Sequence, residues 1–334
     1  MTADALLEIE DLSVVFDTDD GAVQAVDRSS FSLSDGETLG LVGESGSGKS
    51  VTSLAIMGLL PKRARVTGSI RFRGRELLGL SEHELRPLLG ERIAMVFQDA
   101  LAALNPAFTV GNQIAEAITV HHQVSKQEVR VRAIDLLDVV GIPSPQQRVD
   151  NYPHELSGGM RQRAMIAMAI ANEPDLLIAD EPTTALDVTI QAQVLETFER
   201  IQNRTSSAIL LITHDLGVVA GMADRVLVMY AGRPVELADV EDLFYRPRHP
   251  YTAGLLGSLP RLDRRAAGPL TRIKGQPPSL ISLPPGCAFG PRCDHFVKER
   301  CGNERPSFAL VANRHHSSCL RADELGVLSL TADS

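Results

Sequence analysis

The chain has 334 residues, of which 44% are hydrophobic and 22% charged, a balance typical of folded globular proteins rather than disordered ones. Its formal net charge of −9 argues against broad electrostatic binding to nucleic acid, so no nucleic-acid partner is expected. No stretch approaches the roughly 18 apolar residues of a membrane-spanning helix, and the acidic first residues lack the pattern of a signal peptide. We therefore expect a soluble protein, or one that is peripheral on a membrane partner.

The chain begins with a predicted antiparallel hairpin, whose strands cover residues 6–16 and 22–33 on either side of a short turn. Phe16 ends the first of these strands. An aromatic ring at this place is equally suited to stack on a purine base or to fill the hydrophobic core. The residue alone does not distinguish these two interpretations.

A glycine-rich segment at residues 43–50 reads Gly-Glu-Ser-Gly-Ser-Gly-Lys-Ser and fits the phosphate-loop pattern G-x-x-x-x-G-K-[ST]. A buried strand over 38–42 and a helix over 51–60 provide the context that this pattern requires. The glycines let backbone N–H groups point inward, and the helix presents its positive end to an anion. Lys49 is suited to the outer phosphates and Ser50 to Mg²⁺. A glycine turn before an ordinary helix is the alternative, but the context predicts a nucleoside triphosphate site.

A helical block follows two further predicted strands, which cover residues 65–72 and 92–97. Gln98 comes directly after the second strand, where it can carry an oxygen to a metal or a water, or be an ordinary loop residue. Helices over 110–119 and 126–140 then interrupt the alternation of strands and helices. This interruption predicts an inserted helical subdomain.

Ser157, Gly158 and Gly159 precede a helix that is predicted to run to residue 171. Ser157 is suited to cap this helix, because its hydroxyl can accept from a free N–H of the first turn. The bare N–H groups at the positive helix end form a second candidate anion site. A plain N-cap is the alternative.

Polar side chains end two apolar strands in the next part of the chain. Residues 176–179 lead into Asp180 and Glu181, and residues 208–213 lead into His214. Beside a phosphate loop, one carboxylate can hold Mg²⁺ while the next polarises a water for attack on phosphorus. A histidine at a neighbouring strand end can contact a terminal phosphate.

In order and spacing, this set of motifs resembles the ATP-binding subunit of an ABC transporter over about residues 6–242. The matching elements are residues 43–50, Gln98, the signature segment 156–160, Asp180 with Glu181, the segment 185–187 and His214. Met160 replaces the commoner glutamine of the signature segment, but the backbone and Ser157 carry its phosphate contact. The resemblance implies an α/β fold: a P-loop ABC-type nucleotide-binding domain with an antiparallel β-subdomain and a helical insert subdomain.

The resemblance also implies that two such domains close head to tail, with each ATP between one chain's phosphate loop and the other chain's signature segment. Ser50, Gln98 and Asp180 would serve Mg²⁺. Glu181 would be the general base, His214 would sense the γ-phosphate, Lys49 would neutralise developing charge, and Asp187 would also contact the opposite subunit. The implied nucleotide-binding residues are Phe16, Gly43, Glu44, Ser45, Gly46, Ser47, Gly48, Lys49, Ser50, Val51, Gln98, Ser157, Gly158, Gly159 and Asp187.

The tail, from about residue 245 to 320, is similar to that of oligopeptide and dipeptide importer ATPases. The similarity lies in Arg-His-Pro-Tyr-Thr-Ala-Gly-Leu-Leu at residues 248–256 and Ile-Lys-Gly-Gln-Pro-Pro at residues 273–278. From the residues alone, this part reads as a short helix over 251–258 followed by a proline-rich linker.

The last part of the tail holds all four cysteines of the chain: Cys287, Cys293, Cys301 and Cys319. Four thiolates can bind zinc or a four-iron cluster, and the softness of sulfur does not choose between them. The lack of a C-x-x-C pair disfavours the usual zinc-ribbon spacing. The resemblance to cluster-bearing importer ATPases favours [4Fe-4S], with zinc as the alternative, and a structural staple is favoured over a redox role. His315 and His316 lie close to Cys319 and are expected at the surface, with a ligand role as the alternative.

Together these features predict the ATP-hydrolysing subunit of a bacterial peptide importer, peripheral at the cytoplasmic face of the inner membrane. We expect an ABC ATPase domain over 1–245, including a helical insert with the signature over 98–172, and a small metal-binding extension over 246–334. The expected partners are a second, paralogous ATPase, two permease subunits that dock on the insert, and an extracytoplasmic solute-binding protein. The alternatives are an importer of nickel or another small solute, a non-transport ABC ATPase, and an iron–sulfur redox sensor that uses nucleotide as a ligand.

Overall fold

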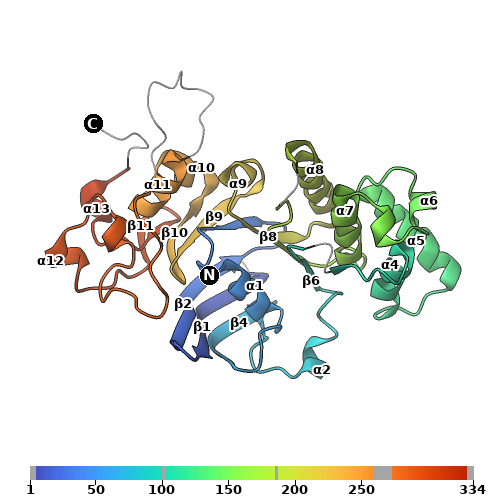
Figure 1. Cartoon of the computed structure of the whole chain (residues 1–334), viewed down its shortest axis with the longest axis horizontal. Helices are drawn as coiled ribbons and strands as arrows, with labels where there is room; N and C mark the ends of the chain where they lie inside the picture. The colour runs from blue at the N-terminus through green and yellow to red at the C-terminus, as the bar shows by residue number, and fades with distance from the viewer. Residues whose placement is uncertain (1–4, 100–102, 185–186, 259–272, 329–334) are drawn as a thin grey trace, which may run out of the picture.

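The computed structural model describes residues 5–99, 103–184, 187–258 and 273–328 (Figure 1). Two β-sheets form its centre. One is four-stranded, in the order β2-β1-β4-β5, and the other is eight-stranded, in the order β11-β12-β10-β9-β3-β8-β7-β6. Figure 1 shows helices α4 to α7 at one end of the molecule and α12 and α13 of the tail at the opposite end.

The smaller sheet is antiparallel throughout and confirms the predicted N-terminal hairpin. Apolar side chains at alternate positions of its first strand are buried, as expected for a sheet with one face on the core. Its strands are β1 (Leu7–Thr18), β2 (Gly21–Leu33), β4 (Ala64–Phe72) and β5 (Arg75–Glu76).

The larger sheet has a parallel centre, in which β6, β7, β8, β3 and β9 run in one direction. These strands are apolar and buried on both faces, which suits a parallel sheet covered by helices. Antiparallel strands from later in the chain extend the sheet. The strands are β3 (Thr38–Val42), β6 (Ile93–Val96), β7 (Leu176–Asp180), β8 (Ala208–Thr213), β9 (Arg225–Tyr230), β10 (Arg233–Asp239), β11 (Ala309–Ala312) and β12 (His315–Ser317).

Most of the longer helices lie where the sequence predicts them, although their ends differ by a few residues. The helix after the phosphate loop begins at Lys49 and ends at Ile56, so the predicted range of 51–60 is wrong at both ends; Gly58, with φ of 64°, follows it. The α-helices are α1 (Lys49–Ile56), α2 (Glu82–Leu85), α4 (Val110–Thr119), α5 (Lys126–Val139), α6 (Pro145–Arg148), α7 (Gly158–Ala169), α8 (Val188–Thr205), α9 (Leu216–Met222), α10 (Val240–Tyr245), α11 (Pro250–Gly257), α12 (Lys298–Cys301) and α13 (Ala322–Leu325). Short 3₁₀ turns are η1 (Pro153–Glu155) and η2 (Gly290–Arg292).

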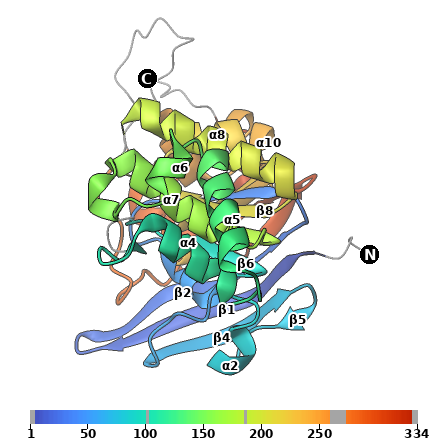
Figure 2. The same cartoon turned by 90° about the vertical axis from the view of Figure 1, so that its right-hand side faces the viewer.

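Two hydrophobic clusters lie around the strands that carry the candidate site. The first joins the two sheets around α1 and includes Leu12, Leu41 and Ile56. The second packs α4, α5, α7 and α8 on strands β6 to β8 and includes Phe198. Figure 2 shows these helices grouped on one side of the larger sheet, above strands β1, β2 and β4. The insert therefore shares a core with the parallel strands that carry the candidate site.

The tail continues the larger sheet, because β12 pairs with β10 and β11 pairs with β12. The expectation that His315 and His316 lie at the surface is wrong for both. His315 is 2% exposed and its Nε2 lies 2.7 Å from Oε1 of the fully buried Glu236. His316 is half-buried and stacks on Phe308. The pairing of β12 with β10 brings His315 against Glu236 of the larger sheet.

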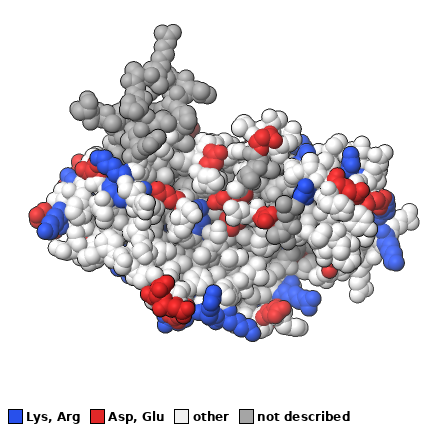
Figure 3. Space-filling model, viewed as in Figure 1, with Lys and Arg blue, Asp and Glu red and all other residues white. Residues whose placement is uncertain are grey.

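Charged side chains of both signs are interspersed over the face drawn in Figure 3. Over the part of the chain that the structure describes, no helix is long and apolar enough to cross a bilayer.

Candidate functional site

The phosphate loop connects β3 to α1 and has a backbone that only glycine tolerates at two of its positions. Gly43 has φ of 152°, and a Cβ there would lie 2.2 Å from the Met229 carbonyl oxygen. Gly48 has φ of 102°, and its Cβ would lie 2.5 Å from the Ala25 carbonyl oxygen. The glycines of the motif therefore allow the loop to lie tightly against β2 and β9.

Polar groups of the loop are arranged as an anion site requires. Lys49 is buried, and its Nζ donates to the carbonyl oxygens of Gly43 at 2.7 Å and Glu44 at 3.0 Å. Burial lowers the pKa of Lys49. Negatively charged phosphate groups beside the ammonium would counteract this lowering of the pKa. The Ser47 hydroxyl is buried and has no hydrogen-bond partner among the described residues. These groups fit a bound polyphosphate.

Ser50 and Asp180 meet at the carboxyl edge of the larger sheet, where Ser50 Oγ donates to Asp180 Oδ1 at 3.1 Å. Parallel strands bring their carboxyl ends to one edge, so β3 and β7 deliver these residues together. Burial raises the pKa of Asp180, and the neighbouring Glu181 raises it further. A hydroxyl and a carboxylate beside the phosphate loop fit Mg²⁺, which prefers oxygen ligands.

Glu181 lies next to this pair and collects three polar neighbours. Its Oε2 accepts from Gln98 Nε2 at 3.1 Å and from Thr184 Oγ1 at 2.7 Å. Its Oε1 lies 3.4 Å from Nδ1 of the exposed His214. Gln98 and His214, each predicted separately as a site residue, are thus both neighbours of Glu181. The sequence did not predict that Thr184 contacts Glu181. The one feature that could have indicated this contact is the position of its hydroxyl group three residues after the carboxylate.

The signature segment forms the predicted N-cap. Ser157 Oγ accepts from the Met160 N–H at 3.3 Å, which confirms the capping of α7. Ser157 and Gly158 are exposed, and within the described ranges no hydrogen bond joins this segment to the phosphate loop. Ser157 and Gly158 are therefore open to solvent.

Five other predicted nucleotide-site residues have a clear place in the fold. Asp187 caps α8 by accepting from the Ile190 N–H at 3.0 Å, and its side is exposed. Phe16 and Val51 are half-buried and pack on the first core cluster. Ser45 and Gly46 are exposed at the loop. The stacking of Phe16 on a purine stays a prediction, because no nucleotide tests it.

Glu44 behaves differently from the rest of the loop, because its side chain turns away from the anion site to the tail. Both of its carboxylate oxygens pair with Arg292, at 2.6 and 2.9 Å. Its backbone N–H donates to the Tyr251 hydroxyl at 2.9 Å. Nothing in the sequence indicated these contacts, since the residues are separated by 248 and 207 positions.

The four cysteines line one small cavity together with His249 and His295. All four are free thiols, and the Cys287 N–H donates to the Cys301 carbonyl oxygen at 2.9 Å. Burial raises the pKa of Cys287 and Cys319 and raises that of Cys293 to about 12. Among the described residues, however, no group of three or more His, Cys, Asp or Glu side chains is placed to hold a metal ion. The donor chemistry suits a soft metal, but the metal-binding tail is without structural support.

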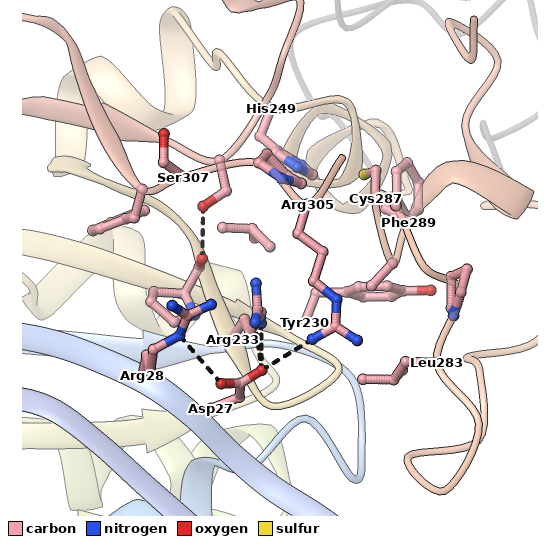
Figure 4. A pocket seen from close by; sticks show the side chains of 18 of the residues that line it. Asp27, Arg28, Tyr230, Arg233, His249, Leu283, Cys287, Phe289, Arg305 and Ser307 are labelled. Atoms are coloured by element: carbon pink, nitrogen blue, oxygen red, sulfur yellow. Dashed lines mark hydrogen bonds and ion pairs between the residues drawn. The ribbon is translucent and has the colours of Figure 1, made fainter. Parts of the chain in front are cut away.

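A separate cavity of about 410 Å³ lies between β2, β10 and the tail (Figure 4). Asp27 at its floor faces three guanidinium groups, with Arg233 Nε at 2.7 Å and the nearest nitrogens of Arg28 and Arg305 each at 3.6 Å. This network links the sheet to the tail. The Asp27 N–H also donates to the Gly232 carbonyl, so the network lies on the strand that backs the phosphate loop.

Two family models match the chain. One is described as ABC transporter and matches residues 26–184. The other is described as oligopeptide/dipeptide transporter, C-terminal region, and matches residues 235–301. The two matches fall on the nucleotide-binding core and on the tail, respectively.

Curated relatives resemble the chain over nearly its whole length. It is 53% identical to the dipeptide transport ATP-binding protein DppD of Bacillus subtilis strain 168, over 96% of this chain and 95% of that protein. It is 53% identical to the oligopeptide transport ATP-binding protein OppD of Escherichia coli K12, over 97% of this chain and 95% of that protein. It is 54% identical to the OppD of Mycobacterium tuberculosis, over 95% of this chain and 52% of that protein. The chain thus spans about half the length of the mycobacterial relatives that it matches.

Solved structures resemble the fold. A dimeric ATP-binding cassette in a post-hydrolysis state with ADP and Pi superposes with a TM-score of 0.64 at 23% identity, over 70% of this chain and 98% of that one. The cbiO1 protein of Clostridium perfringens, described as part of an ABC transporter complex, gives a TM-score of 0.61 at 27% identity. The match covers 72% of this chain and 91% of that one. These matches confirm the α/β P-loop cassette fold.

Proposed function

Because the chain belongs to the family of ATP-binding proteins of oligopeptide and dipeptide ABC transporters, we propose that it hydrolyses ATP to drive the import of peptides. The observation that carries the proposal is the convergence of Lys49, Ser50, Asp180 and Glu181 at one sheet edge. The substrate class rests on the relatives' names and on the tail. The nucleotide-binding domain itself would not touch the transported peptide.

The phosphate loop would hold the triphosphate, with Lys49 exchanging its two carbonyl contacts for phosphate oxygens. Ser50, Asp180 and Gln98 would hold Mg²⁺, which neutralises charge on the phosphates when bound. The buried Ser47 hydroxyl, which has no hydrogen-bond partner among the described residues, would donate to a phosphate oxygen. Positioning and charge neutralisation supply most of the catalysis in phosphoryl transfer.

Glu181 would act as the general base in hydrolysis. A water oxygen forms a bond to the γ-phosphorus while the bond from that phosphorus to the bridging oxygen of ADP breaks. The proton released by the water goes to a Glu181 carboxylate oxygen. Thr184 and Gln98, which donate to Oε2, leave Oε1 as the oxygen nearer to His214 and orient the carboxylate. His214 would contact the γ-phosphoryl group as charge develops.

A second ATPase subunit would complete the site. The exposed Ser157 and Gly158 and the exposed cap residue Asp187 support this part of the proposal, because they have no bond to their own phosphate loop among the described residues. Each ATP would then lie between the phosphate loop of one chain and the signature helix α7 of the other. The partner would be a paralogue, and the pair would work with two permease subunits and an extracytoplasmic solute-binding protein at the cytoplasmic face of the membrane. In this arrangement the part of the insert around residues 98–140 would receive the permease, and residues 246–334 would form the extension.

The four cysteines would bind a [4Fe-4S] cluster, with zinc as the alternative. Their lining of a single cavity supports this, and the soft thiolates suit either centre. Since the thiols do not form a ready ligand group, binding would draw the tail loops together and stabilise them. Iron, sulfide and zinc analysis of anaerobically purified protein, beside a Cys293→Ser variant, tests this part. Equal metal content in the two would contradict it.

The function as a whole is tested with the assembled transporter. ATP hydrolysis and uptake of labelled peptide should both require the wild-type chain, and both should fail with Lys49→Ala. Nickel uptake in place of peptide uptake, at equal ATPase activity, would overturn the assigned substrate. ATP turnover unaffected by the permease would overturn the coupling to transport.

A further inference from the structure

The tail holds the phosphate loop through one buried arginine. Arg292 lies at the end of η2, and its guanidinium forms a bidentate ion pair with Glu44, the second residue of the loop. The two N–O distances are 2.6 and 2.9 Å. Bidentate guanidinium–carboxylate pairs fix orientation as well as charge. This contact therefore sets the direction of a side chain inside the nucleotide-binding motif.

The surroundings of Arg292 lock it in place. Its side chain is only 6% exposed, and its Nε donates to the Lys274 carbonyl oxygen at 2.8 Å. Its guanidinium lies 5.7 Å from the centre of the Tyr230 ring and donates to the Tyr230 hydroxyl at 3.3 Å. The Tyr230 ring contacts the ring of Tyr251, whose hydroxyl accepts from the Glu44 N–H at 2.9 Å. Glu44 is thus held by both its side chain and its backbone.

Glu44 is an unusual residue for a phosphate site, because its negative charge opposes that of the nucleotide. Its carbonyl oxygen accepts from Lys49 Nζ at 3.0 Å, so the residue adjoins the cation that serves the phosphates. An unpaired carboxylate here would repel the triphosphate and compete for Lys49. Pairing with Arg292 compensates this charge and holds the carboxylate toward the tail.

We propose that Arg292 is a positioning residue of the ATP site, which neutralises Glu44 and holds the phosphate loop in its binding shape. The tail is then a part of the nucleotide site of its own chain, rather than only an appendage to it. This inference deepens the proposed function and rests on ATP being the nucleotide that the chain uses.

The test compares kcat and KM for ATP in the assembled transporter. Arg292→Gln should raise the KM for ATP about tenfold, equivalent to about 1.4 kcal/mol, and change kcat much less. Glu44→Gln with Arg292→Gln should return KM to within about threefold of wild type, because no unpaired charge remains. Arg292→Lys, which keeps the charge but not the fork, should give an intermediate KM. Arg314→Gln removes an exposed tail ion pair with Asp239 and should leave KM unchanged.

Two outcomes would overturn the proposal while wild-type protein still binds ATP. One is an unchanged KM in folded Arg292→Gln protein. The other is a double variant with a KM as high as that of the single variant, which would indicate a purely structural role. If Arg292→Gln does not fold, Arg292→Lys replaces it. That variant keeps the charge but loses the bidentate pair and should raise KM about threefold, and an unchanged KM would contradict the proposal. Failure of wild-type protein to bind ATP would instead overturn the proposed function.

Discussion

Replacing Glu181 with Gln changes one carboxylate oxygen to an amide and leaves the size of the side chain unchanged. In the structure, Oε2 accepts from Thr184 Oγ1 at 2.7 Å and from Gln98 Nε2 at 3.1 Å. A glutamine carbonyl can still accept the Thr184 bond, so the local geometry should persist. The side chain, however, can no longer take a proton from water.

Loss of a general base lowers a rate by about 10²–10⁴, which corresponds to roughly 3–5 kcal/mol of barrier. Since Glu181→Gln leaves the phosphate loop, Ser50 and Asp180 unaltered, the Kd for ATP should stay within about threefold of wild type. We therefore expect kcat to fall by about 10³ with ATP binding retained. Steady-state hydrolysis and equilibrium binding of ATP, measured on the same preparation, check both numbers.

Thr184→Val is the matched control for this experiment, because it removes one hydrogen bond to the carboxylate and keeps the base. A hydrogen bond to a charged group contributes about 1.5–3 kcal/mol, so kcat should fall by about tenfold to a hundredfold. A Glu181→Gln protein with kcat within tenfold of wild type would refute the role of Glu181 as base. Parallel loss of ATP binding would also refute it.

Three further predictions concern the phosphate loop and His249, a buried histidine of the tail. Lys49→Ala should weaken ATP binding by at least about tenfold in equilibrium titrations, because the buried ammonium is the loop's full positive charge, and unchanged affinity would contradict this role. Gly48→Ala should lower the free energy of unfolding by about 1–3 kcal/mol and abolish ATP binding, because its Cβ would lie 2.5 Å from the Ala25 carbonyl oxygen. The control is Gly46→Ala, whose Cβ would meet nothing within 4 Å. It should lower the free energy of unfolding by less in the same denaturation experiment. Burial lowers the pKa of His249 to about 3, so the unfolded chain takes up a proton near pH 6.5 that the folded chain does not. The contribution of the neutral His249 to the free energy of unfolding should be fully present above pH 6.5. It should decrease by up to about 1.4 kcal/mol per pH unit between pH 6.5 and 3. A His249→Asn variant should show a shallower pH dependence of unfolding.

The sequence predicted the parts of the site that depend on short segments. The phosphate loop, the strand before it and the carboxylates after residues 176–179 are local patterns, and the structure brings Ser50 within 3.1 Å of Asp180. Strand direction explains this success, because parallel strands deliver their carboxyl ends to one edge. The predicted N-terminal hairpin is also a local pattern, because its two strands are adjacent in the chain, and it was confirmed.

Contacts between distant segments could not be predicted in this way. Arg292 and Glu44 are 248 positions apart, and nothing near Arg292 in the sequence marks it as a partner of the loop. The same holds for β12, a strand of three residues that buries His315 against Glu236. Such short elements obtain their stability from the sheet that they join, so propensity and periodicity carry little signal for them.

The measurement that tests the central claim most directly is peptide accumulation in proteoliposomes that contain the complete transporter, supplied with ATP and peptide-loaded solute-binding protein. We expect ATP-dependent accumulation with the wild-type chain and none with Glu181→Gln, although the variant still binds ATP. Accumulation that continues at the wild-type rate with Glu181→Gln would contradict the claim that hydrolysis at this site powers import.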